Sequence, residues 1–310
     1  MTKTPAKSKN RAVENQVAKC YSTWGTTYFR DYYQSKNAYP PVHQDLVKRE
    51  LKRHGAKTLL DAGCGPASML RGLRFFGTKR YGFDLTPEMV DEAQRVLGRQ
   101  GVPSSQVWLG SVLDPQSYRP AGAARTLRYE SAICFGVLPH IPASADREVF
   151  TNLRGSLKRG GLALVEARNE LFSLFTANRY SHAFMKDRLI REDGLLKRAG
   201  RQKSKIQGAL KAYENFFRMD LPSIRKGKQD EPGYDEVLSR LHNPLEAREQ
   251  FADAGFKNVR VLFYHYHCLP PLFEASAPDF FRKESLLLEE PEDWRGYFMA
   301  SAFVLAGTAA

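Results

Sequence analysis

Cysteine is scarce in this sequence, and long apolar runs are missing from it. The four cysteines, Cys20, Cys64, Cys134 and Cys268, are far apart and form no C-x-x-C pair, which argues against a disulfide framework or a zinc site. No apolar segment approaches the roughly 20 residues that a membrane-spanning helix needs. The basic first residues also lack the apolar core of a secretory signal. We therefore expect a cytoplasmic protein with no bound metal and no membrane span.

The positive charge is concentrated in two segments. The formal net charge is +13, from 47 lysines and arginines against 34 aspartates and glutamates. Residues 188–228 hold 12 basic and 4 acidic side chains, and residues 1–19 hold 5 basic and 1 acidic. The rest is near neutral, so the chain is not a uniformly basic coat for nucleic acid. The stretch 188–228 is either the solvated face of helices or the wall of a site for an anionic molecule.

Short apolar strands alternate with amphipathic helices along much of the chain. The sequence predicts strands over residues 57–61, 80–84, 106–110, 131–135, 162–167, 258–264 and 297–305, the last of them after a long link rich in proline and glutamate. It predicts helices over 42–53, 68–76, 144–158 and 244–254, and Gly160 and Gly161 are expected to end the third of these. This alternation is typical of an α/β fold with a parallel sheet covered on both faces.

The clearest functional pattern is the segment LLDAGCGPAS at residues 59–68, where a predicted strand ends in Asp61 and a glycine turn leads into a helix. Glycines permit a tight bend and let a ligand lie against bare backbone. Dinucleotide folds carry a third glycine where this chain has Ser68. Asp61 would repel a pyrophosphate, but it suits the ammonium of an amino-acid-like ligand. Another nucleotide-binding Rossmann protein is the alternative interpretation.

This segment resembles the first motif of the class I S-adenosylmethionine-dependent methyltransferases, an acid followed by G-x-G-x-G, with Ala67 at the third glycine. Further resemblances follow in order: Asp84 at the end of the second strand, GSV at 110–112, FGVLPHI at 135–141 and LKRGG at 157–161. The family often has an acid where this chain has Ser111. The resemblance implies that S-adenosylmethionine, or its product S-adenosylhomocysteine, contacts Tyr21, Tyr28, Asp61, Gly63, Gly65, Asp84, Leu85, Met89, Ser111, Val112 and Phe135.

The resemblance also implies a fold and a division of the chain. The expected fold is a seven-stranded Rossmann-like sheet in the order 3-2-1-4-5-7-6, with the seventh strand antiparallel. Residues 57–168 and 243–310 would form this core, and residues 169–242 a helical lid inserted after the fifth strand. Residues 13–56 would form an N-terminal helical cover behind a flexible basic tail, residues 1–12.

Candidates for the acceptor side follow the fourth, fifth and sixth strands. His140 is a candidate general base, although a shape-setting role is the simpler interpretation. His265 and His267 alternate onto one face, a spacing that can bind metal; without a carboxylate or cysteine cluster, a packed pair is favoured. The residues expected to contact the acceptor are His140, Arg168, Asn169, Arg179, Tyr180, His182, His265 and His267.

We interpret the chain as an enzyme that methylates a small molecule, on oxygen or nitrogen rather than carbon, in specialised or cell-envelope metabolism. The basic insertion suggests an anionic acceptor, free or bound to a carrier. An RNA or protein methyltransferase is the alternative enzyme, although the VLPH at 137–140 differs from the N/D-P-P-Y of RNA base methyltransferases. A non-catalytic Rossmann module that binds nucleic acid through the basic insertion is the alternative of another class.

Overall fold

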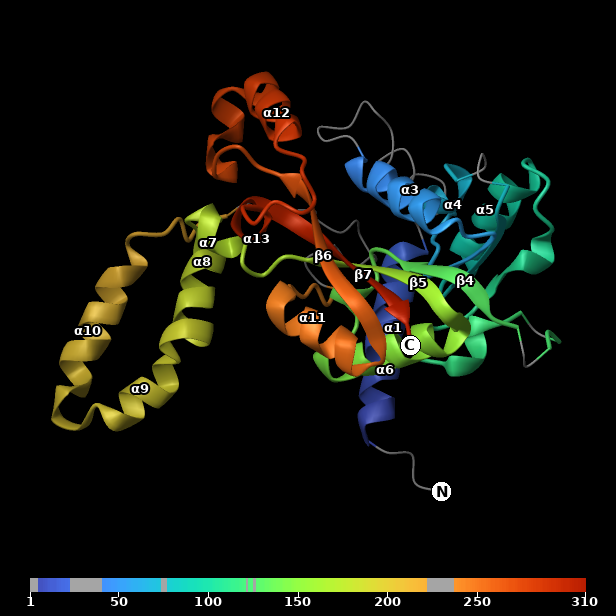
Figure 1. Ribbon diagram of the computed structural model, residues 1–310. Helices are drawn as coiled ribbons and strands as arrows, with labels where there is room; N and C mark the ends of the chain where they lie inside the picture. Colours follow the sequence, from blue (N-terminus) through green and yellow to red (C-terminus); the bar gives the residue numbers. More distant parts are fainter. Residues whose placement is uncertain (1–4, 23–40, 74–76, 121, 125–126, 222–236) are drawn as a thin grey trace.

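A computed structural model describes residues 5–22, 41–73, 77–120, 122–124, 127–221 and 237–310 (Figure 1). Its centre is a seven-stranded sheet in the order β3-β2-β1-β4-β5-β7-β6. Strand β7 runs antiparallel to both of its neighbours, and the other pairings are parallel. This order and direction confirm the predicted fold. The strands are β1 Thr58–Ala62, β2 Lys79–Asp84, β3 Val107–Leu109, β4 Tyr129–Cys134, β5 Leu157–Arg168, β6 Phe256–Tyr266 and β7 Ala300–Ala309.

Two hydrophobic layers cover the sheet because successive strand residues point to opposite faces. Leu59 belongs to a buried cluster with side chains of α3 Val42–His54, α4 Ser68–Arg71 and α5 Pro87–Gly98. Its neighbour Leu60 belongs to the opposite cluster, with side chains of α6 Asp146–Ser156 and α11 Pro244–Asp253. Such a two-faced arrangement leaves the carboxyl ends of the parallel strands open for a ligand.

Two expected boundaries are corrected by the structure. Helix α6 ends at Ser156, and β5 begins at Leu157, so Gly160 and Gly161 lie within the strand. A Cβ on Gly161 would approach the carbonyl oxygen of Lys158 to 2.9 Å, so close backbone approach requires glycine there. The long link before β7 contains α12 Pro278–Leu287 and α13 Gly296–Met299. The expected flexible tail is helical from its fifth residue onward, in α1 Pro5–Tyr21.

The insertion after β5 is a helical arm that projects from the sheet (Figure 1). It contains α7 Ser173–Thr176, α8 Arg179–Ala183, the π-helical η6 Phe184–Ile190, α9 Glu192–Arg198, the 3-10 turn η7 Gly200–Gln202 and α10 Lys203–Glu214. Asn169 pairs with His242, and Asn178 with Arg218, in isolated bridges between the outgoing and returning chain. In the described part of the chain, no helix combines the length and apolarity needed to cross a bilayer.

Candidate functional site

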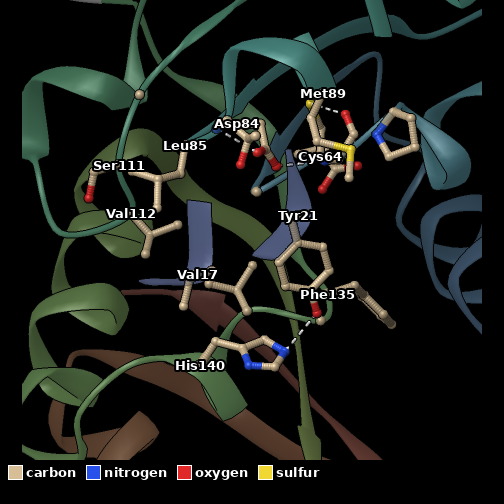
Figure 2. Close-up of a pocket in the computed structure, with 18 of the residues that line it drawn as sticks. Val17, Tyr21, Cys64, Asp84, Leu85, Met89, Ser111, Val112, Phe135 and His140 are labelled. Carbon is tan, nitrogen blue, oxygen red and sulfur yellow. Dashed lines mark hydrogen bonds between the residues drawn. The ribbon is translucent and has the colours of Figure 1, made fainter. Parts of the chain in front are cut away.

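A hollow of about 910 Å³ lies at the carboxyl ends of the central strands, and both Asp61 and Asp84 line it (Figure 2). Asp61 belongs to β1, and Asp84 is the last residue of the neighbouring β2. The two predicted acids therefore share one cavity.

The glycine turn between β1 and α4 shapes the floor of this hollow. The backbone amides of Gly63 and Cys64 both donate to the carbonyl oxygen of Phe83, at 2.9 Å, which fixes the turn to β2. Gly63 has a φ of +82°, and a Cβ there would lie 2.3 Å from a methyl of Val137. Ala67, at the position of the third glycine, is left-handed too, with a φ of 60°. The turn thus depends on backbone conformations that L-residues disfavour.

Asp84 is held in a fixed orientation by backbone amides. Its Oδ2 accepts a hydrogen bond from the Gly65 amide at 2.8 Å, and its Oδ1 accepts one from the Thr86 amide at 3.0 Å. Burial raises the pKa of Asp84 above its ordinary value, although these two amides act in the opposite direction. Thr86, the residue before α5, makes no side-chain cap bond.

Asp61 is nearly inaccessible, with 2% of its surface exposed. Burial first, and the charge of Asp84 second, raise the pKa of Asp61 well above its ordinary value. None of the described residues that line the hollow is a lysine or arginine. A ligand that brings a positive charge to Asp61 is therefore favoured.

The end of the hollow beside Ser111 is apolar, with Leu85 and Val112 (Figure 2), and Met89 and, from α1, Val17 also line the hollow. Such surfaces suit the faces of a flat ring. The acids at one end and the apolar slot at the other fit S-adenosylmethionine, which carries an amino-acid ammonium, a ribose diol and a purine.

His140 connects three segments at the same cavity. Its Nδ1 lies 2.7 Å from the carbonyl oxygen of Leu238, and its Nε2 lies 3.0 Å from the hydroxyl of Tyr21 (Figure 2). A carbonyl can only accept, so the ring proton is on Nδ1, and Nε2 accepts from Tyr21. Burial lowers the pKa of His140 to about 4, opposed by the Leu238 carbonyl and assisted by the charge of Arg168. The ring is therefore neutral at pH 7.

All predicted cofactor residues within the described part of the chain line this hollow, and Tyr28 lies outside the described residues. Sequence reasoning missed Glu14 and Val17, which line it from α1. Their spacing to Tyr21 was the available signal, because residues 14, 17 and 21 share one face of a helix.

A second, more open hollow of about 1670 Å³ brings together Arg168, Asn169, Arg179 and Tyr180, four of the predicted acceptor residues. Val237 and Ser239 also line it. Val237 packs against Met89 of the first hollow, and the intervening residue, Leu238, is bonded to His140. The segment 237–239 thus forms a wall between the two hollows: it lines the second and contacts residues that line the first.

Asn169 lines the second hollow, but its side chain is hydrogen-bonded to the backbone of neighbouring segments. Its amide nitrogen donates to the carbonyl oxygens of Gly296, Tyr297 and Ala300, and its Oδ1 accepts from the amide of Leu171. These bonds use the capacity of the amide group and join the end of β5 to the start of β7. Asn169 therefore anchors the insertion.

The three other histidines that were predicted to contact the acceptor, His182, His265 and His267, line neither hollow. The His182 ring packs against Tyr213 and Phe217 inside the arm. His265 and His267 stack at 5.2 Å between ring centroids, and His267 also contacts Phe172. Burial lowers the pKa of His265 to about 4 and that of His267 to about 3. These environments are those of packing residues.

The described basic side chains of residues 188–228 do not contribute to the second hollow. Arg188 instead pairs with Glu170 and Glu246, and Arg218 with Asp220. The two guanidinium groups that do line the hollow, Arg168 and Arg179, precede the basic stretch. The solvated-face interpretation of that stretch is therefore the better one.

Comparisons with known proteins agree with this geometry. A family model described as "Methyltransferase domain" matches residues 33–261. No curated protein matches the sequence. The structure resembles magnesium protoporphyrin IX methyltransferase from Synechocystis PCC 6803 with bound SAH, with a TM-score of 0.50 and 17% identity over 96% of this chain and 100% of that one. It also resembles an S-adenosylmethionine-dependent methyltransferase from Clostridium acetobutylicum ATCC 824, with a TM-score of 0.52 and 9% identity over 93% and 96% of the two chains.

Proposed function

Since this chain belongs to the class I S-adenosylmethionine-dependent methyltransferases, we propose that it methylates an oxygen or nitrogen of a small anionic molecule. One observation carries the choice of acceptor: a hollow with two guanidinium groups shares a wall with the hollow of the two acids. The acceptor's anion would lie in the second hollow, and its nucleophile would reach the first beside His140.

The cofactor placement in this proposal follows the polarity of the first hollow. Asp61 would meet the ammonium, because its carboxylate is buried without a described lysine or arginine in the lining. Asp84, already oriented by two backbone amides, would accept from the ribose hydroxyls. The purine would lie between Leu85, Met89 and Val112. Phe135, His140 and Tyr21 are left around the reacting end.

Methyl transfer needs alignment more than acid or base groups, because the bound cofactor carries the methyl on a sulfonium and so supplies the reactivity. His140 is a weak base here: its pKa is about 4, and its Nε2 already accepts from Tyr21. We therefore assign His140 a positioning role. An acceptor atom that needs no strong base, such as a carboxylate or acidic hydroxyl oxygen or an amine nitrogen, suits this site.

Contacts with neighbouring side chains orient the guanidinium groups of Arg168 and Arg179. Arg168 donates to the hydroxyl of Ser239 at 2.5 Å, in the shared wall. Arg179 donates to the hydroxyl of Tyr180 at 3.1 Å, and its guanidinium carbon lies 5.0 Å from the centre of that ring. These contacts support a site for a carboxylate or phosphate, because orientation lowers the entropy lost when the anion binds.

Radiolabelled methyl transfer tests the proposal. Small carboxylates and phosphates, their neutral amides or alcohols, RNA and proteins are each offered with tritiated S-adenosylmethionine. We expect transfer to an anionic small molecule. Arg168→Gln and Arg179→Gln should each raise its KM about tenfold or more, since charge-assisted hydrogen bonds contribute about 1.5–3 kcal/mol. Arg248→Gln, which removes an exposed arginine of α11, is the matched control.

Transfer confined to RNA or protein would overturn the small-molecule proposal. Equal transfer to neutral and anionic partners, with unchanged KM in both arginine variants, would overturn the anionic part alone. Retention of full S-adenosylhomocysteine affinity in Asp84→Ala would overturn the cofactor placement.

A further inference from the structure

A carboxylate from outside the core reaches the apolar end of the cofactor hollow. Glu14 of α1 lines this hollow, and its Oε1 accepts a hydrogen bond from the hydroxyl of Ser111, the residue two positions beyond β3. The Ser111 hydroxyl oxygen in turn accepts from the amide of Leu113 at 3.0 Å. This second bond orients the hydroxyl so that its proton points to Glu14. The loop after β3 therefore holds the carboxylate in place.

The surroundings of Glu14 define what it can bind. Leu85, Val112 and Val17 supply apolar surface at the same end. The other carboxylate near Leu85, Asp84, accepts from two backbone amides and is assigned to the ribose hydroxyls in the cofactor placement proposed above. A flat ring in this slot that carries an N–H group on its edge would find its hydrogen-bond acceptor in Glu14. The purine of the cofactor has one such group, the 6-amino group.

We propose that Glu14, held by Ser111, binds the 6-amino group of the adenine and makes α1 part of the cofactor site. This proposal rests on the cofactor placement proposed above. A carboxylate accepts such a bond about twice as strongly as a neutral oxygen does. The site would thereby distinguish adenine from a purine that lacks the amino group.

The packing of α1 explains why Glu14 stays at this end of the hollow. Val17, Cys20 and Tyr21 pack together with Met89 and Val237. One helical turn beyond Val17, the Tyr21 hydroxyl is bonded to His140. Residues 14, 17 and 21 thus form one face of α1 that follows the hollow from its apolar end to its reacting end. The helix cannot rotate about its axis without breaking these contacts.

Calorimetry with two nucleosides tests the proposal: S-adenosylhomocysteine and its analogue with hydrogen in place of the 6-amino group. We expect the parent protein to bind S-adenosylhomocysteine at least tenfold more tightly than the analogue. Glu14→Ala should reduce this preference to less than threefold by weakening S-adenosylhomocysteine, with little change for the analogue. Glu14→Gln should lie between, because an amide oxygen still accepts without charge.

Gln16→Ala is the matched control, because it changes an exposed side chain of the same helix and should leave the preference unchanged. Ser111→Ala removes the group that holds Glu14 without altering α1, so it should lower the preference in the same direction by a smaller factor. An undiminished preference in both Glu14→Ala and Ser111→Ala would overturn the proposal while leaving the methyltransferase assignment intact. Failure of the parent to bind either nucleoside would instead overturn the cofactor placement itself.

Discussion

Asp61 is an unusual residue because its neighbours disfavour its charge. Burial and the carboxylate of Asp84 both raise its pKa well above the ordinary value. A carboxylic acid with a raised pKa in the folded state adds stability below its ordinary pKa, and this contribution is lost as the pH rises. Ionised Asp61 therefore lowers the stability of the ligand-free protein, and a bound ammonium would remove this destabilisation.

Binding of S-adenosylhomocysteine should release a proton from Asp61. The ligand's ammonium favours the carboxylate, so it lowers the raised pKa on binding. Affinity should then increase with pH until free Asp61 is ionised, and level off above that pH. Calorimetry between pH 5 and 8, in buffers of different ionisation enthalpy, measures the released protons. Asp61→Asn should remove most of the release; the same number of protons in that variant would contradict the assignment.

Gly63 is the residue at which the turn tolerates substitution least. Gly63→Ala combines a φ of +82° with a Cβ 2.3 Å from a methyl of Val137, whereas Gly65→Ala has a φ of +51° and open space around its Cβ. Left-handed backbone costs an L-residue about 1–2 kcal/mol, and overpacking costs about 1–3 kcal/mol more. Urea unfolding should show the larger loss for Gly63→Ala. Equal losses in the two variants would mean that Val137 yields without cost.

At the scale of elements, the outgoing and returning ends of the insertion are fastened to the core separately. Arg240, on the returning chain, lies 2.5 Å from Asp146 of α6 and also donates to the carbonyl oxygen of Ile141 at 2.6 Å. Its backbone amide donates to Pro139 at 2.8 Å. Arg240 therefore joins the returning chain to α6 by an ion pair and to the loop that carries His140 by two hydrogen bonds.

Arg240→Met should destabilise the protein by about 2–5 kcal/mol, because it leaves the buried carboxylate of Asp146 without its guanidinium partner. Urea unfolding measures the loss, and Arg248→Met, at an exposed arginine of α11, provides the matched control. In a double-mutant cycle, the added substitution Asp146→Asn should cost less than it does alone. Strictly additive losses would show that the pair is not coupled.

Local patterns predicted the elements well where strand and helix signals alternate. The turn at Asp61 and the sheet order follow from short-range spacing and a family resemblance. The position of α1 does not, because its contacts with Met89 and Val237 join residues far apart in sequence. Likewise, glycines can end a helix or allow close strand approach, and the sequence around Gly161 does not distinguish the two.

The acceptor side was the least predictable part of the site, because it too is formed by residues that are far apart in sequence. Lysines and arginines in an amphipathic segment look alike whether they face a cavity or water. Arg188 is paired within the insertion and with α11, whereas Arg168 and Arg179 line the hollow. The difference depends on how α8 and η6 leave the sheet, which no local signal specifies. The concentration of charge in residues 188–228 therefore did not identify the residues that line the second hollow.

At the scale of the whole molecule, four histidines have pKa values below the ordinary value of the imidazole group. Burial lowers the pKa of His43, His140 and His265 to about 4 and that of His267 to about 3. The unfolded chain takes up protons near pH 6.5 while the folded protein does not, so stability falls as the pH drops through that value. Between pH 7 and 5 each histidine should contribute a loss of about 2 kcal/mol.

Urea unfolding at pH 7 and pH 5 should therefore show a large loss of stability, even though Asp61 and Asp84, whose pKa values are raised, act in the opposite direction. His267→Gln isolates one contribution: comparing the two pH values within the same variant cancels its packing defect, and the loss should shrink by about 2 kcal/mol. His54→Gln changes an exposed histidine at the end of α3 and should leave the loss as it is in the parent. If His267→Gln and the parent lose equal stability, His267 titrates normally in the folded protein, and the acid sensitivity must come from other groups.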